Sequence, residues 1–286
     1  FIVKKILIDV KNQGDKAVIK YEKKFSNIKS KQIKIKFSKE EINNISKKVG
    51  KNLKRSIDIA YTRIKKFHLK QKITPFKYKD KYNNELTYRY SSIDRVGVYV
   101  PGGTASYPST VLMNCIPALV AGVRNIYLTT PSLGSLVNPA IIYAAKKCGV
   151  KEIYKTGGAH SIAAFTYGTK TFKKVDKIVG PGNMYVASAK KEVYGDVGID
   201  MVAGPSEVSI IADKDSNPDW IASDLIAQAE HDTFSQSILI TNSVDLIKSV
   251  NVSLKVQLKN LPKKQIASKS LKNFGIAIYT NKISNI

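Results

Sequence analysis

The sequence of 286 residues is poor in the features that mark membrane, secreted and metal-rich proteins. No apolar run approaches the roughly 20 residues of a membrane-spanning helix, and no basic start followed by an apolar stretch and a cleavage site is visible. The two cysteines, Cys115 and Cys148, have neither a metal-ligand spacing nor the number that a disulfide framework needs. We therefore predict a soluble protein of the reducing cytoplasm, with no membrane partner.

Acidic residues are also scarce, because 22 Asp and Glu stand against 47 Lys and Arg, for a net charge of +25. Residues 1–90 hold 26 of the basic and 8 of the acidic residues, so +18 of the charge lies in the first third. Nearly all of these basic residues are lysines, spread singly through stretches such as "YTRIKKFHLKQK", without an arginine cluster or an aromatic stacking motif. This pattern favours a solvated lysine face, and a nucleic-acid-binding protein is the less favoured alternative.

The first 70 residues have a mostly helical pattern, interrupted by "KQIKIKFS". There Ile33, Ile35 and Phe37 alternate and predict a short strand. Ser38 then caps a helix, and Glu41 completes a capping box. Residues 72–85 read as a polar loop, and "LTYRYSSI" predicts a second alternating strand.

From residue 95 onward, short apolar runs alternate with helical segments, which is the pattern of a parallel, doubly wound sheet. The runs are "VGVYV", "NIYLTT", "EIYKTG", "DKIVG" and "IDMVA", and after a Gly-Pro break "VSIIAD", "SILIT" and "GIAIYT". We predict an α/β fold of two such units, one inserted in the other. Residues 1–98 and 207–286 would form the first, discontinuous domain, and residues 99–206 the inserted domain.

Glycine-rich turns follow several of the predicted strands, at the end where ligands bind in such sheets. They are "PGGTASYPS" (101–109), "TGGAHS" (156–161), "GPGNMY" (180–185) and "AGPSEV" (203–208). Glycine allows close backbone approach and helix N-termini attract anions, which suits a phosphate-bearing cofactor. Two nucleotide fingerprints are excluded: no G-x-G-x-x-G follows the first strand, and Gly103 stands where a P-loop needs lysine.

Individual side chains in these turns have two interpretations each. Tyr99 ends a strand and could stack on a ligand ring or pack in the core. His160 opens a helix after two glycines, where a hydrogen-bond donor could meet a ligand. Asn183 is a good helix N-cap, and Ser206 could bind a ligand or turn the chain. Ser206 has no visible Ser-His-Asp companions, so we do not assign it as a nucleophile.

The stretch "DLIAQAEHD" (224–232) carries one of only three histidines in the chain. Gln228 and His231 are three residues apart on a predicted helix, so they share a face. Imidazole is a common metal ligand and an amide oxygen a weaker one. Two ligands do not make a zinc site, and from spacing alone a polar helix face is the favoured interpretation.

Three long motifs together resemble the histidinol dehydrogenase family: "RVGVYVPGGTASYPSTVLMNCIPALVAGV", "KVDKIVGPGNMYVASAKKEVYGDVGIDMVAGPSEVSIIAD" and "IASDLIAQAEHD". The resemblance implies a zinc-containing, NAD-dependent homodimer that oxidises L-histidinol through the aldehyde to L-histidine, the last steps of histidine biosynthesis. It also implies two incomplete Rossmann-like domains, with residues 99–206 as the NAD-binding one. A paralogous dehydrogenase of another polar alcohol stays open as an alternative.

Carried over residue by residue, the resemblance makes Gln228 and His231 zinc ligands that also face the substrate, and Ser206 a substrate-binding residue. Tyr99 and Asn183 match positions that contact NAD. The third such position is usually glutamine in the family, and here it is His160. The remaining zinc ligands, an Asp and a His, and the catalytic Glu-His pair would lie beyond residue 286. The expectation is a fragment that lacks the C-terminal region and the extreme N-terminus, holds no catalytic residue and is inactive.

Overall fold

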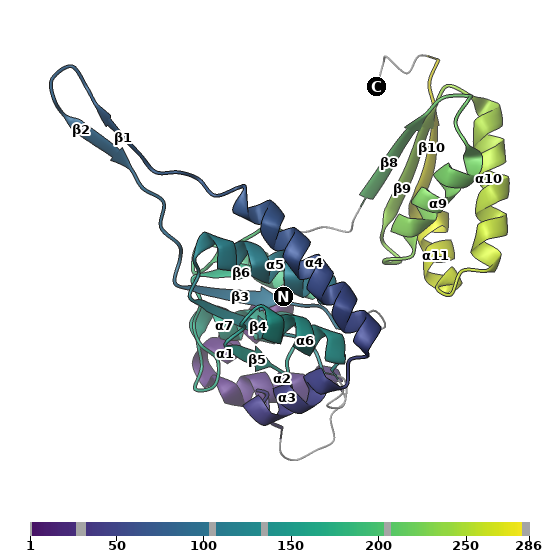
Figure 1. Ribbon diagram of the computed structural model, residues 1–286. Coiled ribbons are helices and arrows are strands. Elements are labelled where there is room, and N and C mark those ends of the chain that lie inside the picture. Colours follow the sequence, from purple (N-terminus) through teal and green to yellow (C-terminus); the bar gives the residue numbers. More distant parts are fainter. Residues whose placement is uncertain (1, 27–32, 103–106, 133–136, 203–206, 282–286) are drawn as a thin grey trace. The chain divides into compact units, whose positions relative to one another are not determined.

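The computed structural model describes residues 2–26, 33–102, 107–132, 137–202 and 207–281 (Figure 1). Contacts within the chain divide it into two compact units, Phe1–Val202 and Ala203–Ile286, here called unit 1 and unit 2. The predicted division into residues 1–98 with 207–286 and an inserted 99–206 stays a prediction. None of the described helices is long and apolar enough to cross a membrane.

Unit 1 is built on a parallel five-stranded sheet with the strand order β5-β4-β3-β6-β7. Its strands are β3 (Arg95–Tyr99), β4 (Asn125–Thr129), β5 (Glu152–Tyr154), β6 (Lys177–Val179) and β7 (Gly198–Ile199). The first strand is central: the chain adds two strands on one side of β3 and then two on the other. The prediction of a parallel sheet is confirmed, and the strand order reverses between β3 and β6.

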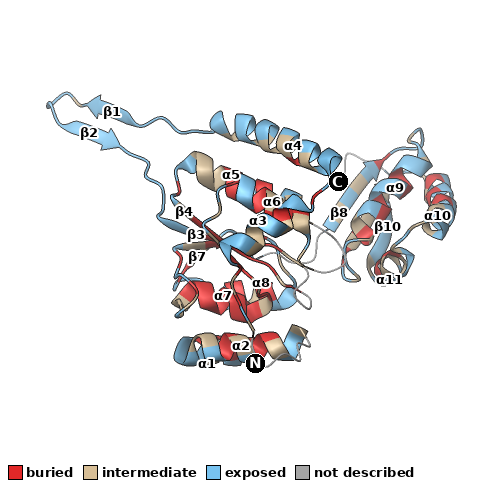
Figure 2. Cartoon of the chain, turned by 60° about the horizontal axis from the view of Figure 1, so that its bottom comes forward, coloured by how far each residue is buried: buried red, intermediate tan, exposed pale blue. Residues whose placement is uncertain are grey.

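Helices cover both faces of this sheet in two layers (Figure 2). One face is covered by α5 (Pro108–Ala121) and α6 (Pro139–Lys147), with α3 (Lys39–Lys47) and α4 (Lys51–Leu69) outside them. The other is covered by α7 (Gly158–Tyr167) and α8 (Met184–Val193), with α1 (Ile2–Gln13) and α2 (Asp15–Ser26) outside. Because both faces are covered, the strands are near-continuous apolar runs.

The central strand carries a glycine where α7 comes nearest to the sheet. A side-chain carbon on Gly97 would lie 2.8 Å from a ring carbon of Phe165, a contact that real structures do not show. Phe165 is fully buried and packs edge-on against Tyr154 and Phe172, which stack on each other with ring centroids 3.8 Å apart. The missing side chain at position 97 thus sets how closely α7 approaches β3.

In the N-terminal part of unit 1, the predicted capping box is present and the predicted strand around Ile35 is reduced to a bridge. Ser38 Oγ accepts a hydrogen bond from the Glu41 N–H (3.1 Å), and the Glu41 carboxylate accepts one from the Ser38 N–H (2.7 Å), so the capping box is confirmed. The alternating stretch around Ile35 forms only a single antiparallel bridge, between Lys36 and Tyr154 at the edge of the sheet.

The predicted loop over residues 72–85 is partly wrong, because a hairpin of β1 (Phe76–Lys79) and β2 (Glu85–Tyr88) occupies this region. Every strand residue of the hairpin is exposed, and it stands out from the rest of unit 1 (Figure 1). The rings of Phe76 and Tyr88 stack across the strands at 5.6 Å. With no buried face, the hairpin lacks the contrast between polar and apolar sides by which strands are usually found.

Unit 2 is a three-stranded parallel sheet with the order β10-β9-β8. It contains β8 (Glu207–Ala212), α9 (Pro218–Ala229), β9 (Gln236–Thr241), α10 (Val244–Lys259), α11 (Lys264–Phe274) and β10 (Gly275–Tyr279). In β9, Ser237, Leu239 and Thr241 are buried and alternate with half-buried residues. These elements confirm the predicted strand and helix alternation after residue 207.

Candidate functional site

The turns after β3, β4 and β5 meet at the carboxyl edge of the five-stranded sheet. A side-chain carbon on Gly102 would lie 3.0 Å from Pro131, and one on Gly157 would lie 2.3 Å from the Pro131 ring. Glycine at both positions therefore lets the three turns pack together around one proline. In open α/β sheets this edge, near the reversal of strand order, is where ligands bind.

Tyr99, at the end of β3, is buried at this edge with 3% of its surface exposed. Its hydroxyl accepts a hydrogen bond from the Gly158 N–H at 3.1 Å, and burial raises the pKa of Tyr99 to about 12. Gly158 has a φ of +65°, a conformation that favours glycine. Tyr99 is thus neutral and supports the turn after β5. It packs in the core and also lies beside the sheet edge at which a ligand is predicted to bind.

His160, in the first turn of α7, is also buried, with 2% of its surface exposed. Its Nε2 lies 2.9 Å from Oε2 of Glu22 on α2, and the same carboxylate oxygen accepts a hydrogen bond from the Gly157 N–H at 3.4 Å. The rings of Tyr21 and Phe25, from the same helix, stack on the imidazole with centroids 6.3 and 6.1 Å away. His160 is therefore held between α7 and α2.

Two buried side-chain atoms have no hydrogen-bond partner among the described residues, His160 Nδ1 and Thr130 Oγ1. Both belong to the same edge: Thr130 directly follows β4, and His160 lies in the turn of helix that follows β5. Buried polar atoms are nearly always paired in native proteins, so atoms left unpaired mark places where a ligand or water is bound. Their joint position gives this edge unused hydrogen-bonding capacity for a ligand or water.

Asn183 lies in the turn after β6 and is exposed. Its Oδ1 accepts hydrogen bonds from the Tyr185 and Val186 N–H groups, each 3.1 Å long, so it is the N-cap of α8. The same turn approaches Tyr99, because a side-chain carbon on Gly180 would lie 2.1 Å from the Tyr99 carbonyl oxygen. The capping interpretation is confirmed, and a contact with NAD stays a prediction.

The residues predicted for zinc and substrate lie in unit 2 or outside the described residues. Gln228 is in the last turn of α9 and donates a hydrogen bond from Nε2 to Ser235 Oγ at 3.4 Å, and His231 is exposed just after that helix. Ser206 lies outside the described residues. Among the described residues no group of three or more His, Cys, Asp and Glu side chains could hold a metal. An amide and one imidazole do not complete a zinc site.

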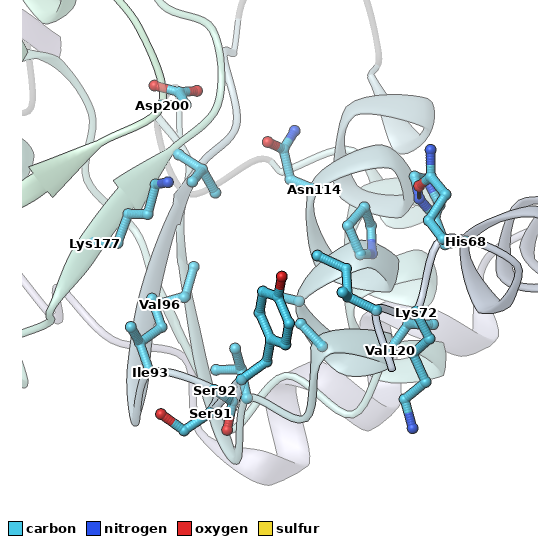
Figure 3. Close-up of a pocket in the computed structure, with 18 of the residues that line it drawn as sticks. His68, Lys72, Ser91, Ser92, Ile93, Val96, Asn114, Val120, Lys177 and Asp200 are labelled. Carbon is cyan, nitrogen blue, oxygen red and sulfur yellow. Dashed lines mark hydrogen bonds between the residues drawn. The ribbon is translucent and has the colours of Figure 1, made fainter. Parts of the chain in front are cut away.

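A cavity of about 610 Å³ in unit 1 lies elsewhere (Figure 3). Val96 and Lys177 line it from the sheet, and Asn114 and His68 from the side of α5 and α4. None of the six residues predicted from the sequence lines this cavity. It lies where α5 covers β3 and leaves part of the same face of β6 open.

Sequence reasoning missed Glu22 and Thr130. A signal for Glu22 was present, because it follows the buried residues Ala17, Val18 and Tyr21 on the apolar face of α2. A carboxylate at such a position needs a buried partner. Thr130 carried no comparable signal, since a threonine at the end of a strand is common.

Comparison with known proteins gives one consistent family. The sequence model described as histidinol dehydrogenase matches residues 2–286. The histidinol dehydrogenase of Pelagibacter ubique is 55% identical over 276 residues, which are 96% of this chain and 64% of that protein. That of Agrobacterium fabrum is 47% identical over 283 residues, 99% of this chain and 66% of that protein.

A solved structure agrees with these sequences. The crystal structure of histidinol dehydrogenase from Elizabethkingia anophelis has a TM-score of 0.91 and 42% sequence identity, and the match covers 99% of this chain and 65% of that one. The chain thus spans about two thirds of the length of the relatives that it matches.

Proposed function

The chain belongs to the histidinol dehydrogenase family, and we propose that it contributes to an NAD-dependent oxidation of L-histidinol through the aldehyde to L-histidine. The observation that carries this proposal is the family match over residues 2–286 together with 55% identity to a relative of that name. Because the relatives are longer, the activity is proposed for the whole enzyme, as a homodimer in the cytoplasm. Both cysteines are free and buried, in keeping with that compartment.

The residues at the carboxyl edge of the five-stranded sheet fit NAD. The strand order supports a Rossmann-like sheet, and Tyr99 at the end of β3 and Asn183 in the turn after β6 lie on either side of its reversal. The two unpaired polar atoms, His160 Nδ1 and Thr130 Oγ1, add hydrogen-bonding capacity.

In this proposal Tyr99 and Asn183 hold the turns in position and do not take part in proton transfer. When bound, NAD supplies the acceptor for the hydride of the alcohol carbon. Tyr99 remains protonated at neutral pH because its pKa is raised to about 12, so it orients the Gly158 turn and does not act as a base. Asn183 fixes the start of α8 and leaves its amide nitrogen for the ligand. The general base and the acid–base steps belong to residues beyond this chain.

The described residues do not complete the ligand set of the proposed zinc site. Gln228 and His231 would supply two ligands that also face the substrate, with Ser206 nearby, and the remaining ligands would come from the longer enzyme. Two neutral donors give neither the charge nor the closed coordination of a catalytic zinc site. We therefore expect this chain alone to bind zinc weakly.

A paired experiment tests the proposal. The chain of residues 1–286 and a version extended by the C-terminal region of a relative are purified, and bound zinc and NADH formation with histidinol are measured. We expect both only in the longer version. There, His231→Ala should lose zinc, whereas the control His68→Ala, which changes a half-buried histidine of α4, should keep it.

Two outcomes would contradict the proposal. Turnover of histidinol by residues 1–286 alone would show that the missing ligands and base are not needed. A longer version that ignores histidinol but oxidises another amino alcohol would instead favour the paralogous dehydrogenase.

A further inference from the structure

We propose that Glu22, on α2, is a positioning residue of the nucleotide site: it fixes His160 in one tautomer, so that Nδ1 accepts a hydrogen bond from a ribose hydroxyl of the nucleotide. The inference rests on the proposed binding of NAD. It adds a residue from the N-terminal helices to a site otherwise built from the strand-to-helix turns.

The Glu22 carboxylate is surrounded by donors. It is 1% exposed. Oε1 accepts a hydrogen bond from the Ser26 hydroxyl at 2.6 Å, and Oε2 accepts from the Gly157 N–H at 3.4 Å. His160 Nε2 completes the set at 2.9 Å. Both carboxylate oxygens of Glu22 act as acceptors, so His160 Nε2 is the donor in the third contact and carries the proton.

This proton position determines what Nδ1 can do. A neutral imidazole with its proton on Nε2 presents a lone pair at Nδ1, which then needs a donor. Nδ1 has no partner among the described residues although the ring is buried. The Nδ1 and Cε1 atoms lie 3.5 Å from the place where a side-chain carbon on Gly158 would be, so this edge of the ring faces the turn at the sheet edge.

The same surroundings select a hydroxyl over a phosphate. The Glu22 carboxylate, within hydrogen-bond distance of the imidazole, disfavours an anionic group of the ligand beside it. Thr130 Oγ1, the other unpaired buried atom at this edge, can both donate and accept. Each of the two hydroxyls of a ribose diol can donate and accept. They therefore match the His160 Nδ1 acceptor and the Thr130 hydroxyl.

Helix α2 holds the imidazole from three positions of one face. Tyr21 and Phe25 stack on the ring, and Glu22 between them binds its Nε2. Ring orientation and tautomer are thus both set by a segment 138 residues away in the sequence. This is the geometry by which a neighbouring carboxylate usually fixes which imidazole nitrogen carries the proton.

The test uses the unmodified chain labelled with ¹⁵N-histidine. With only three histidines in the sequence, the His160 resonances are identified by their loss in His160→Gln. We expect the Nε2–H tautomer of His160 before NAD is added, and a shift of the Nδ1 resonance as NAD binds. In Glu22→Gln the tautomers should mix and NAD affinity should fall about tenfold, as expected for one hydrogen bond. The matched control Glu40→Gln changes an exposed carboxylate on α3 and should leave both unchanged.

The outcomes separate this inference from the proposed function. NAD that binds without moving the Nδ1 resonance overturns the role of His160 and leaves the NAD site in place. An imidazolium with both nitrogens protonated in the complex overturns it in favour of a phosphate contact. Failure of the unmodified chain to bind NAD overturns both. The spectra of the unmodified chain decide these points even if Glu22→Gln does not fold.

Discussion

Gly180→Ala should strongly destabilise unit 1, because the backbone leaves no room for the added carbon. Gly180 begins the turn after β6 with a φ of +110°, and its side-chain carbon would lie 2.1 Å from the Tyr99 carbonyl oxygen. The obstructing atoms belong to the main chain of the central strand and cannot rotate away. Gly180 is also fixed by hydrogen bonds, donated to Asp200 at 2.8 Å and accepted from Lys190 at 3.0 Å. Adding about 1–2 kcal/mol for the disfavoured φ to about 1–3 kcal/mol for overpacking gives a loss of about 2–5 kcal/mol.

Gly149→Ala separates the two contributions. Gly149 has a φ of +66° and nothing within 4 Å of the added carbon, so this variant should lose only the conformational part, about 1 kcal/mol. Both free energies of unfolding are obtained from urea titrations followed by far-ultraviolet circular dichroism, with equal slopes as the check on two-state behaviour. Equal losses in the two variants would refute the backbone clash and with it the tight contact between the turn and β3.

Three further predictions concern the cap, the charges and the thiols. Asn183→Ala should cost about 1 kcal/mol of unfolding free energy, because two N–H groups of α8 lose their acceptor, and a urea titration measures it. The hydrogen bond from Lys147 lowers the pKa of Asp58 below 3.8, so its stabilisation is present above that pH and is lost as the pH falls through the folded-state pKa; Asp58→Asn should make stability less dependent on pH below 4. Cys115 and Cys148 should resist a thiol reagent in the native protein and react in urea, because both are buried and the pKa of Cys115 is raised by its contact with Cys148 and by burial.

The order of strands and helices could be predicted because each element has a signal in its own stretch of sequence. The strand-to-helix alternation after residue 95 places each parallel strand, since buried strands are continuous apolar runs separated by helical segments. The hairpin was predicted only in part: β2 overlaps the predicted strand "LTYRYSSI", whereas β1 fell in the predicted loop because it buries no face. A turn signal was nevertheless present: Asp80 accepts hydrogen bonds from the N–H groups of Tyr82 and Asn84, and Asn83 has a positive φ of 65°.

The site was predictable only in part, because its decisive contacts join distant segments. Tyr99 and Asn183 could be placed at strand ends from the sequence, and the structure brings their two turns together through Gly180. The pairing of His160 with Glu22 spans 138 residues, and no spacing rule connects them. Residues implied by resemblance alone, such as Gln228, need the remainder of the enzyme before their role can be tested.

Gly97 lets core packing set the distance between the sheet and the turn that carries His160. The Phe165 ring of α7 occupies the space that a side chain at position 97 would need, and the first turn of the same helix carries His160. A larger residue at position 97 would lift α7 from the sheet and carry that turn with it. Positions 97 and 165 are therefore expected to change together in evolution, one growing as the other shrinks. If NAD binds this turn as proposed, substitutions at this pair should alter NAD affinity although neither residue contacts the cofactor.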